Sequence, residues 1–392
     1  MLRELLRFVA SRAAARPPVP VVEDPALSDT YRVVQDPGQC FQFEPLTEEG
    51  ERRYAFSQML DNYSQSREGA AKVQTFTPRV ARLDQGSVLG LSFLSATRDK
   101  TTCLNFFTHN PLNPDKVTNF EETANVDLVG PDLIRGRFDG IDRYDEGVLV
   151  GDHWNFGHWL YNHLARLALA AAAPRLKGVP LVVGENIPPS HVECLERMGF
   201  PDSMLIRLRK GRLARFRTLW APMMPLCGWE RHIFWSPGTI AFLRERLGVD
   251  PDARARPGRR LYITRRGSRW RRVLNEDEVV ALLAQWGFEV IDPGALSIAR
   301  QVEIASDAEV IMGPFGAGLN LFLFAPRGAT IFELKYPVPT MDINLSICTH
   351  IGQRFVPVVG FPVVAAANEM NHDFIVTPDV VEKALETTGL RR

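Results

Sequence analysis

The sequence predicts an α/β protein with two Rossmann-like domains that face a cleft. Three observations support this fold class. Strands alternate with helices from residue 147 onward and again from residue 258, which is the pattern of parallel sheets. A helix at 237–247 and a Pro- and Arg-rich stretch at 250–258 separate the two runs. At 392 residues the chain is long enough for each domain to bury its own core.

The predicted domain organisation has five parts. They are a leader at 1–20, an N-terminal α/β domain with an extended beginning at 21–236, a linker helix and loop at 237–257, a C-terminal Rossmann-like domain at 258–362, and a return segment with a last helix at 363–392. The leader is not a convincing signal peptide, since charges interrupt it. As a helix, residues 1–16 gather leucines on one side, which suits peripheral contact with a membrane surface; packing on the protein's own core is the interpretation we favour.

Composition excludes several classes of partner. Lys+Arg and Asp+Glu both number 46, so no net charge attracts the chain to nucleic acid. Arginines nevertheless gather at 207–217 and at 254–272, and such runs are usually solvated faces. The five cysteines are scattered and never form C-x-x-C, which favours neither disulfides nor zinc and indicates a cytoplasmic location. No apolar run reaches the length of a membrane span.

The N-terminal region begins with extended segments and then becomes regular. Before residue 147 we expect strands at 80–94 and 103–107 and a helix at 48–63, and we find no chemistry there. After it, the pattern predicts a helix at 158–173 and another at 190–198 with Ser190 as its N-cap. The expected strands of this run are 148–150, 181–183, 204–208 and 218–221.

The C-terminal run repeats the alternation. Its expected strands are 261–264, 289–291, 310–312 and 330–333. Its expected helices are 276–286, 298–306 and 318–324, and a last helix follows at 379–385. Asn275, with Glu278 three residues later, is a predicted N-cap pair. Because parallel strands bind ligands at their carboxyl ends, we look for the site in the loops that follow them.

A glycine turn is the feature around which the C-terminal run is arranged. Residues 309–320 read E-V-I-M-G-P-F-G-A-G-L-N, an apolar strand, a glycine turn and the start of a helix. This geometry lets backbone amides approach a phosphate closely, although any tight β–α turn also needs glycine. Arg265 and Arg269 follow the neighbouring strand, so we expect them to reach the turn and form a metal-free diphosphate clamp. The alternative is an exposed basic loop.

A second group of candidate residues follows strand 148–150. It reads G-D-H-W-N-F-G-H-W from Gly151 to Trp159. His158 is a candidate general base, with Asp152 to orient it or to serve instead; a capping or core histidine is the alternative. His153, His158 and His163 are spaced by five residues, which turns each about 140° from the last on an α-helix, so we reject a metal site. Trp154 and Trp159 could stack on a sugar, but we favour burial in the core.

Several familiar motifs are absent. The one D-x-D, at 250–252, lies in the linker, which counts against a metal-dependent sugar transferase. G-x-G-x-x-G and the P-loop pattern do not occur, which counts against dinucleotide enzymes and kinases.

An ordered set of motifs over about residues 145–340 resembles the family 61 glycosyltransferases, the DUF563 domain. The motifs are N-F-G-H-W at 155–159, R-R-G-S-R at 265–269, N-E at 275–276, G-F-E-V at 287–290, Q-V at 301–302, G-P-F-G-A-G-L at 313–319 and F-E-L at 332–334. The resemblance implies a GT-B architecture and a nucleotide-sugar donor, which is a UDP-sugar in the family's characterised members. It also implies inverting transfer of a hexosyl or pentosyl group without metal or other cofactor. Bacterial relatives of this kind make capsular or other surface polysaccharides, so the implied partner is a glycan or lipid-linked glycan acceptor.

The resemblance also implies roles for particular residues. Arg265 and Arg269 would contact the donor diphosphate, and Gly316, Ala317, Gly318, Leu319 and Asn320 would hold the nucleotide. His158, with Asn155 and Trp159 beside it, would lie on the acceptor side, in the N-terminal domain. One position departs from the family's G-x-H-G-A-G turn, because Phe315 replaces the histidine. Phenylalanine can stack but not hydrogen-bond to phosphate.

Two other functions compete with sugar transfer. A pyruvyltransferase acting on polysaccharide can also use paired Rossmann-like domains and an arginine-lined site. A catalytically degenerate member that binds nucleotide sugars as a scaffold is suggested by Phe315. Saturation-transfer NMR with UDP and phosphoenolpyruvate would distinguish a pyruvyltransferase from a glycosyltransferase. Binding of a nucleotide sugar without hydrolysis or transfer would identify the degenerate scaffold.

Overall fold

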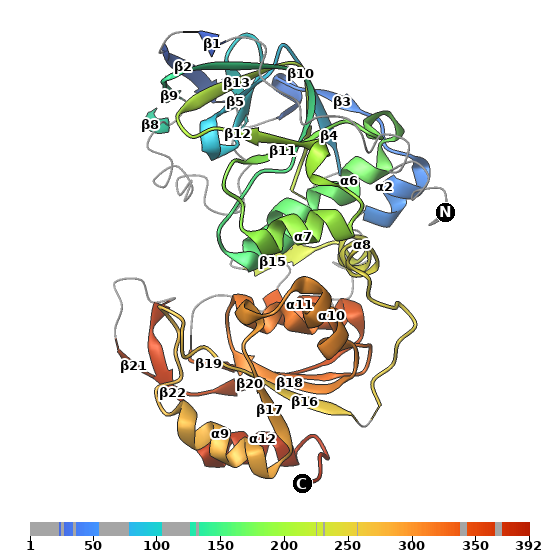
Figure 1. Cartoon of the computed structure of the whole chain (residues 1–392), viewed down its shortest axis with the longest axis vertical. Coiled ribbons are helices and arrows are strands. Elements are labelled where there is room, and N and C mark those ends of the chain that lie inside the picture. Colours follow the sequence, from blue (N-terminus) through green and yellow to red (C-terminus); the bar gives the residue numbers. More distant parts are fainter. Residues whose placement is uncertain are drawn as a thin grey trace. The chain divides into compact units, whose positions relative to one another are not determined.

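The computed structural model divides the chain into two compact units, which are described separately (Figure 1). Unit 1 consists of Met1–Glu230 with Trp235–Thr239, and unit 2 of Arg231–Phe234 with Ile240–Arg392. The residues described are 23–24, 27–33, 37–54, 78–103, 126–130, 133–224, 226–229, 232–256, 258–337, 343–364 and 371–392. The leader predicted at 1–20 therefore lies outside them.

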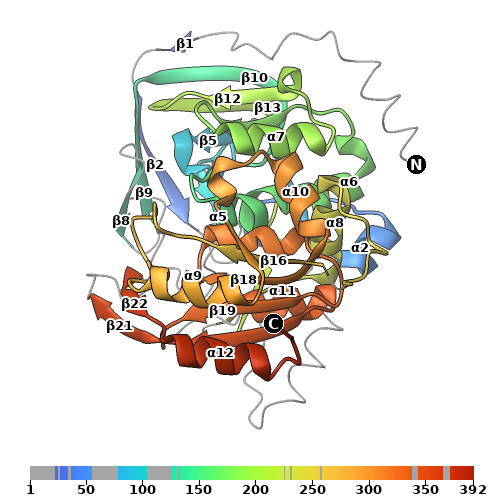
Figure 2. The same ribbon diagram turned by 60° about the horizontal axis from the view of Figure 1, so that its bottom comes forward.

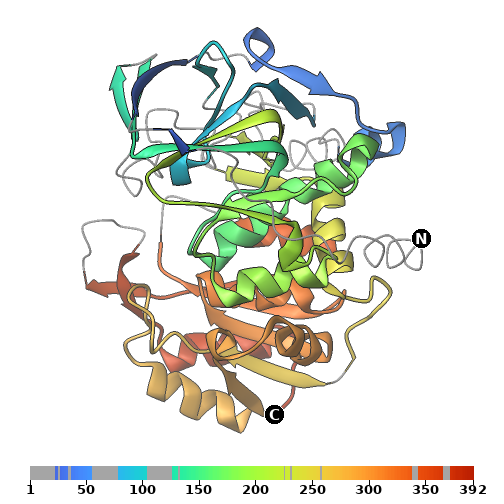
Figure 3. The same ribbon diagram turned by 45° about the horizontal axis from the view of Figure 1, so that its top comes forward.

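The larger sheet of unit 1 is built around two long parallel strands, β10 (Gly140–Leu149) and β13 (Arg212–Pro222), which lie side by side (Figure 3). Parallel strands β11 (Leu181–Gly184) and β12 (Leu205–Leu208) extend it beyond β10. On the other side the sheet turns antiparallel at β4 (Val80–Asp84). Its short strands are β1 (Glu23–Asp24), β3 (Gln42–Glu44), β5 (Ser87–Leu89) and β6 (Ser95–Ala96). The parallel part brings the carboxyl ends of β10 and β11 to one edge.

A second, four-stranded sheet of unit 1 has the order β7-β2-β9-β8. Its strands are β2 (Leu27–Val33), β7 (Thr101–Thr102), β8 (Val126–Gly130) and β9 (Leu133–Phe138). The strand predicted at 103–107 is wrong at its start, since β7 ends at Thr102, and residues 104–107 lie outside the described part of the chain. The predicted extended character of this region is confirmed for these strands.

The helices of unit 1 differ from the predicted ones in detail. The single helix expected at 158–173 is instead α5 (Phe156–His158), a π-helical segment (Trp159–Leu164) and α6 (Arg166–Ala172). Helix α7 (Pro189–Arg197) begins one residue before Ser190, and its N-terminus has Pro188 and Pro189, whose fixed φ suits a helix start, so the predicted Ser190 cap is wrong. Helix α2 covers Glu48–Tyr54, and 55–63 lie outside the described residues. The 3₁₀ turns are Pro37–Gln39, Gly90–Ser92, Pro174–Leu176 and Asp202–Met204.

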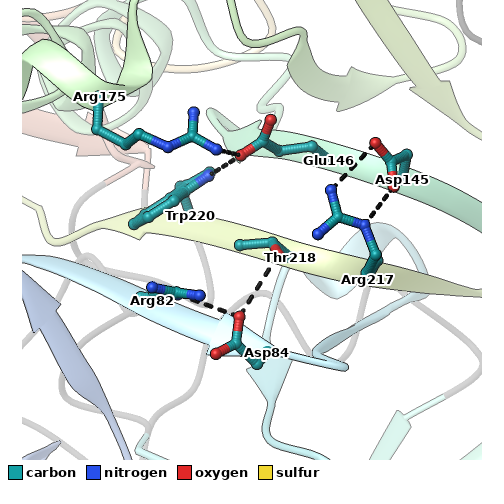
Figure 4. Close-up of polar contacts among 8 residues, drawn as sticks. All are labelled: Arg82, Asp84, Asp145, Glu146, Arg175, Arg217, Thr218 and Trp220. Atoms are coloured by element: carbon teal, nitrogen blue, oxygen red, sulfur yellow. Dashed lines mark hydrogen bonds and ion pairs between the residues drawn. The ribbon is translucent and has the colours of Figure 1, made fainter.

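The first arginine cluster forms several ion pairs within unit 1. Arg217, the member of the cluster drawn in Figure 4, pairs with Asp145. In the same view Glu146 accepts hydrogen bonds from Arg175 and from the indole of Trp220, both at 2.8 Å. Arg209 and Arg212 both bind the buried carboxylate of Asp142, and Arg207 binds Asp202. Four members of the cluster, Arg207, Arg209, Arg212 and Arg217, are thus paired with carboxylates, and we assign these four a structural role.

Unit 2 contains a five-stranded, entirely parallel sheet of order β17-β16-β18-β19-β20. The strands are β16 (Arg259–Ile263), β17 (Phe288–Ile291), β18 (Ala308–Pro314), β19 (Thr330–Lys335) and β20 (Arg354–Val359). Four of them lie within a few residues of their predicted places. They were recognisable because strands buried on both faces read as apolar runs.

Helices cover both faces of this sheet (Figures 1 and 2). Tyr262, Val310, Met312 and Phe332 pack with side chains of α9 (Glu276–Gln285) and α12 (Pro378–Glu386), and their strand neighbours are buried on the opposite face. The helices of that second face are α10 (Ile298–Ser306) and α11 (Ile343–Ile351). The segment after β18 is a 3₁₀ helix, Ala317–Phe324, rather than the predicted α-helix. Another 3₁₀ turn is Pro293–Ala295.

The remaining elements are short. The boundary between the units runs through β15 (His232–Trp235) and α8 (Pro237–Leu247), which follow β14 (Leu226–Trp229). In unit 2, β21 (Phe361–Val364) and β22 (Asp373–Ile375) form an antiparallel pair. The prediction of a mixed α/β protein is confirmed. In the part of the chain described, no helix has both the length and the apolarity needed to cross a bilayer.

Candidate functional site

The glycine turn of unit 2 lies where the sheet topology predicts a ligand site. Strands β16 and β18 are parallel neighbours, with Leu261 opposite Ile311 and Tyr262 opposite Met312. The loops after them, which begin at Thr264 and Phe315, therefore leave the same edge of the sheet. Ligands of open parallel sheets bind at this edge.

Arg265 lies directly against the turn. Gly316 has φ 156° and ψ 178°, a region that only glycine occupies readily. A Cβ at Gly316 would come 2.2 Å from Nη1 of Arg265, so the missing side chain is what allows this approach. The guanidinium is positioned by a hydrogen bond from its Nη2 to the carbonyl oxygen of Trp270 at 3.0 Å. The backbone of Arg265 is fixed as well, since its N–H donates to Glu276 at 3.3 Å. The structure thus brings Arg265 and Gly316 together as predicted.

Four arginines of the second cluster are paired with carboxylates. Arg259 pairs with Glu289, Arg260 with Glu309, Arg266 with Glu276 and Asp277, and Arg272 with Asp373. Arg254 lies at the start of the cluster, before β16, and donates to backbone carbonyl oxygens of its own loop. In the loop after β16, Arg265, Arg269 and Arg271 form no ion pair with any described residue, so we consider them as cations for a ligand.

Arg269 and Arg271 differ in their surroundings. Arg269 is exposed, and its guanidinium lies over the neighbouring Trp270 ring at 4.6 Å. Arg271 is half-buried, and its guanidinium lies 4.9 Å from the centre of the Phe315 ring, in the turn itself. The contact predicted between Arg269 and a diphosphate stays a prediction. Arg271 is a candidate that the sequence analysis missed; only its place in the basic run pointed to it.

The guanidinium groups of Arg265 and Arg271, beside the turn, are positively charged and poorly solvated. The pKa of Arg265 is lowered to about 10, chiefly by burial and also by the charge of Arg271, while Asp373 and Glu276 partly offset these effects. Burial likewise lowers the pKa of Arg271, against the effect of Tyr336 and Glu333. Both remain protonated at neutral pH, since guanidinium resists deprotonation. An anion would relieve their repulsion.

The rest of the predicted nucleotide-binding set is less accessible. Ala317 and Gly318 are half-buried in the turn, whereas Leu319 is completely buried and Asn320 nearly so. Leu319 donates its backbone N–H to the carbonyl oxygen of Gly316, which closes the first 3₁₀ turn. The side chain of Leu319 therefore supports the turn from below.

In unit 1, the loop after β10 is fixed by two buried histidines. His163 bonds through Nδ1 to the carbonyl oxygen of Val150 at 3.0 Å, and a Cβ at Gly151 (φ 94°) would come 2.6 Å from that nitrogen. His191, on α7, donates from Nε2 to the carbonyl oxygen of His153 at 2.9 Å. Burial lowers the pKa of His191 to about 4, so it is neutral and structural. Its importance was missed because its partner is distant in sequence.

His158 has the geometry of a general base. Its Nδ1 lies 3.0 Å from Oδ1 of buried Asn162, one helical turn on; since an amide oxygen only accepts, Nδ1 carries the proton. Nε2 is then the ring nitrogen that carries a lone pair, which is the form that a general base needs. The Asn162 amide nitrogen donates to the sulfur of Met224 at 3.7 Å, which fixes its orientation.

Asp152 does not orient His158. Its Oδ1 is buried and has no hydrogen-bond partner among the described residues, and Oδ2 lies where a Cβ of Gly184 would come within 2.5 Å. Burial raises the pKa of Asp152, partly opposed by the backbone N–H of His153. Asn162 takes the orienting position that we had predicted for this carboxylate.

The three histidines gather, and the argument that spacing separates them was wrong. The ring centres of His153 and His158 are 4.4 Å apart, and those of His153 and His163 6.3 Å apart. His153 lies in the loop before α5, so the rotation per residue of a helix does not apply to it. From His158 onward the chain is π-helical, with Ala165 donating to the carbonyl oxygen of Leu160, five residues back, and this wider turn reduces the rotation between positions five apart. Still, no group of His, Cys, Asp and Glu in the described residues could hold a metal ion.

The aromatic residues separate into buried and exposed ones. Trp159 is completely buried and stacks on His191 with ring centres 4.6 Å apart, which is the core packing that we favoured. Trp154 is 65% exposed beside His153. Asn155 caps α5, since its Oδ1 accepts the backbone N–H of Gly157 at 2.9 Å. Of these side chains, Trp154 has the most surface to offer a sugar.

Comparison with known proteins finds a family that this part of the chain resembles. Residues 156–332, a little under half of the chain, match the model of the family described as Glycosyltransferase 61. This range is therefore similar to a glycosyltransferase 61 domain. It begins at the N-terminus of α5 and ends in β19, so it includes His158, Asn162, Arg265, Arg271 and the glycine turn. The resemblance seen in the motifs is confirmed.

Two relatives are similar to parts of this chain. The EGF domain-specific O-linked N-acetylglucosamine transferase of Drosophila melanogaster is 33% identical over 96 residues, 24% of this chain and 18% of its own. Alpha-1,3-arabinosyltransferase XAT3 of Oryza sativa subsp. japonica is 38% identical over 78 residues, 19% of this chain and 13% of its own. The chain thus spans less than a fifth of either relative.

Proposed function

We propose that this protein is an inverting, metal-independent glycosyltransferase whose donor is a nucleotide sugar linked to UDP. The observation that supports it most is the pair of half-buried guanidinium groups without carboxylate partners beside a glycine turn, inside the range that is similar to a glycosyltransferase 61 domain. A diphosphate leaving group needs positive charge that is already in place when its own negative charge develops.

In the proposed reaction each unit has one task. Nε2 of His158 takes the proton of an acceptor hydroxyl, whose oxygen attacks the anomeric carbon from the face opposite the nucleotide. The bond from that carbon to the diphosphate oxygen breaks, and Arg265 with the amides at 316–318 stabilises the departing charge. Donor binding by unit 2 and base catalysis by unit 1 correspond to a GT-B arrangement, which we include in the proposal.

The wider role is part of the same proposal. The relatives' names give different sugars, N-acetylglucosamine and arabinose, so either a hexosyl or a pentosyl group suits the domain. We propose a capsular or other surface glycan, or its lipid-linked precursor, as acceptor, and a cytoplasmic enzyme that works at the inner face of the membrane. Cell fractionation and the glycan profile of a deletion strain test this.

The decisive experiment has a binding part and a reaction part. Calorimetry with UDP and other nucleoside diphosphates should give binding without added metal and in the presence of EDTA. Incubation with a panel of UDP-sugars should then give transfer or slow hydrolysis of one of them. Binding without either reaction would support the degenerate, scaffolding alternative, and binding of phosphoenolpyruvate in place of UDP would support pyruvyl transfer.

A further inference from the structure

In the loop after β16, the consecutive residues Arg271 and Arg272 have different surroundings. Arg272 is fixed to β22: its backbone N–H donates to Oδ1 of Asp373 at 2.8 Å, and its guanidinium pairs with Oδ2 at 2.6 Å. The carbonyl oxygen of Arg272 accepts the N–H of Phe374 at 3.0 Å, and Leu274 donates back to Phe374 at 2.8 Å. This segment therefore lies beside β22 and forms an isolated parallel bridge with it at Val273.

Arg271 is left in a strained backbone conformation at the start of that segment. Its φ is 57°, in the left-handed region that side chains other than glycine rarely adopt. Such residues persist where the surroundings over-determine them, often at functional sites. Here the contacts of Arg272 with β22 impose the conformation, and the side chain of Arg271 lies against Phe315 instead of following Arg272.

Phe315 holds this guanidinium in a way that hydrogen-bonding side chains cannot. The contact is with the ring face, so it uses the charge of Arg271 but none of its N–H groups. Nε of Arg271 is buried and has no hydrogen-bond partner in the described chain. Arg265 lies against the next residue, Gly316, and its own Nε is also buried without such a partner. Two cations with unused donors thus flank consecutive residues.

We propose that Arg271, held by the ring of Phe315, is a second anion ligand of the turn, so that Arg265 and Arg271 together bind the two phosphoryl groups of a diphosphate. That the diphosphate belongs to a nucleotide rests on the proposed function. Binding of the diphosphate by the two arginines does not depend on it. It also gives a role to Phe315, which replaces the histidine of the family's turn. A histidine at this position could contact the ligand itself, whereas the ring of Phe315 positions an arginine that does so. The site should therefore prefer diphosphates to monophosphates.

The test uses the full chain and two probes, UDP and inorganic pyrophosphate, titrated by calorimetry with UMP for comparison. Arg271→Gln should weaken UDP and pyrophosphate about 10- to 100-fold and UMP less, which lowers the preference for diphosphate. Phe315→Leu should weaken both probes about 3-fold or more by releasing the guanidinium, while Phe315→Tyr keeps the ring face and the affinity. Arg300→Gln, an exposed arginine of α10 that pairs with Glu303, is the charge-matched control and should change nothing.

The outcomes separate this inference from the proposed function. Unchanged UDP and pyrophosphate affinity in Arg271→Gln, with loss in Arg265→Gln, overturns the role of Arg271 and leaves the donor site standing. Pyrophosphate binding that depends on Arg271, without UDP binding, supports the inference and overturns the nucleotide donor. If the wild-type chain binds neither probe, both fail. Arg271→Lys and thermal melting of each variant guard against misfolding, since lysine keeps the charge and should bind with intermediate affinity.

Discussion

His158 and Asn162 form the residue pair on which the proposed chemistry depends. We expect His158→Ala to abolish transfer and to leave UDP affinity unchanged, because UDP is assigned to the other unit. Asn162→Ala should lower kcat by about 10- to 100-fold, since the imidazole then loses the partner that fixes its tautomer and orientation. Exogenous imidazole should restore part of the activity to His158→Ala but not to Asn162→Ala. Steady-state turnover that survives in His158→Ala would remove this residue from the mechanism.

His191 should make the stability of unit 1 depend on pH. Burial lowers its pKa to about 4 in the folded chain, against about 6.5 when unfolded. Between these values only the unfolded chain takes up the proton, so the contribution of His191 is fully present above about pH 6.5 and is lost as the pH falls towards 4. Urea unfolding from about pH 7 to about pH 4.5 should show a steeper decline for the wild type than for His191→Gln, which keeps a donor for His153. Parallel curves would contradict this.

At the scale of elements, the glycine turn should tolerate no side chain at position 316. In Gly316→Ala the new methyl group would meet the end of the Arg265 side chain, which can move aside, so we expect Arg265 to be displaced and UDP affinity to fall about 10-fold or more. Gly267→Ala is the matched control, because a Cβ there meets nothing within 4 Å. Calorimetry on both variants checks this, and equal losses would show that the turn acts through general loop rigidity.

Asn275 illustrates how a local pattern can conceal a long-range contact. Its side chain does not cap α9; its Oδ1 accepts the N–H of Val376 at 3.2 Å and its Nδ2 donates to the carbonyl oxygen of Val376 at 2.9 Å. Asn275→Ala should therefore lower the free energy of unfolding by about 1–3 kcal/mol, as for two lost hydrogen bonds. If Asn275 and Glu278 formed a capping pair, Glu278→Ala would also be destabilising. We expect instead that Glu278→Ala changes the free energy of unfolding by no more than about 0.5 kcal/mol. Urea denaturation distinguishes the two.

The sequence predicted the elements better than the contacts between them. The strands of unit 2 were recognisable, because burial on both faces leaves continuous apolar runs. The π-helical turn at 159–164 was not, since its residues read as an ordinary α-helix. The error about the three histidines came from this and from placing His153, which lies in the loop before α5, on the same helix. The sequence alone does not distinguish Arg269 from Arg271. The structure does, through the left-handed backbone at Arg271 and the contact of Arg272 with Asp373, 101 residues away.

For the whole molecule, the division into two units predicts where a nucleotide acts. UDP should protect amides in the loop after β16 and in the turn after β18, and at about 100 times its dissociation constant it should stabilise the unit that binds it by about 2.7 kcal/mol. The loop after β10, which carries Asp152 and leads to His158, should gain less protection from UDP alone, since it is assigned to the acceptor. Hydrogen exchange of the full chain with and without UDP measures both. Protection that appears first around His158 would assign the donor to unit 1 and reverse the proposed division of tasks.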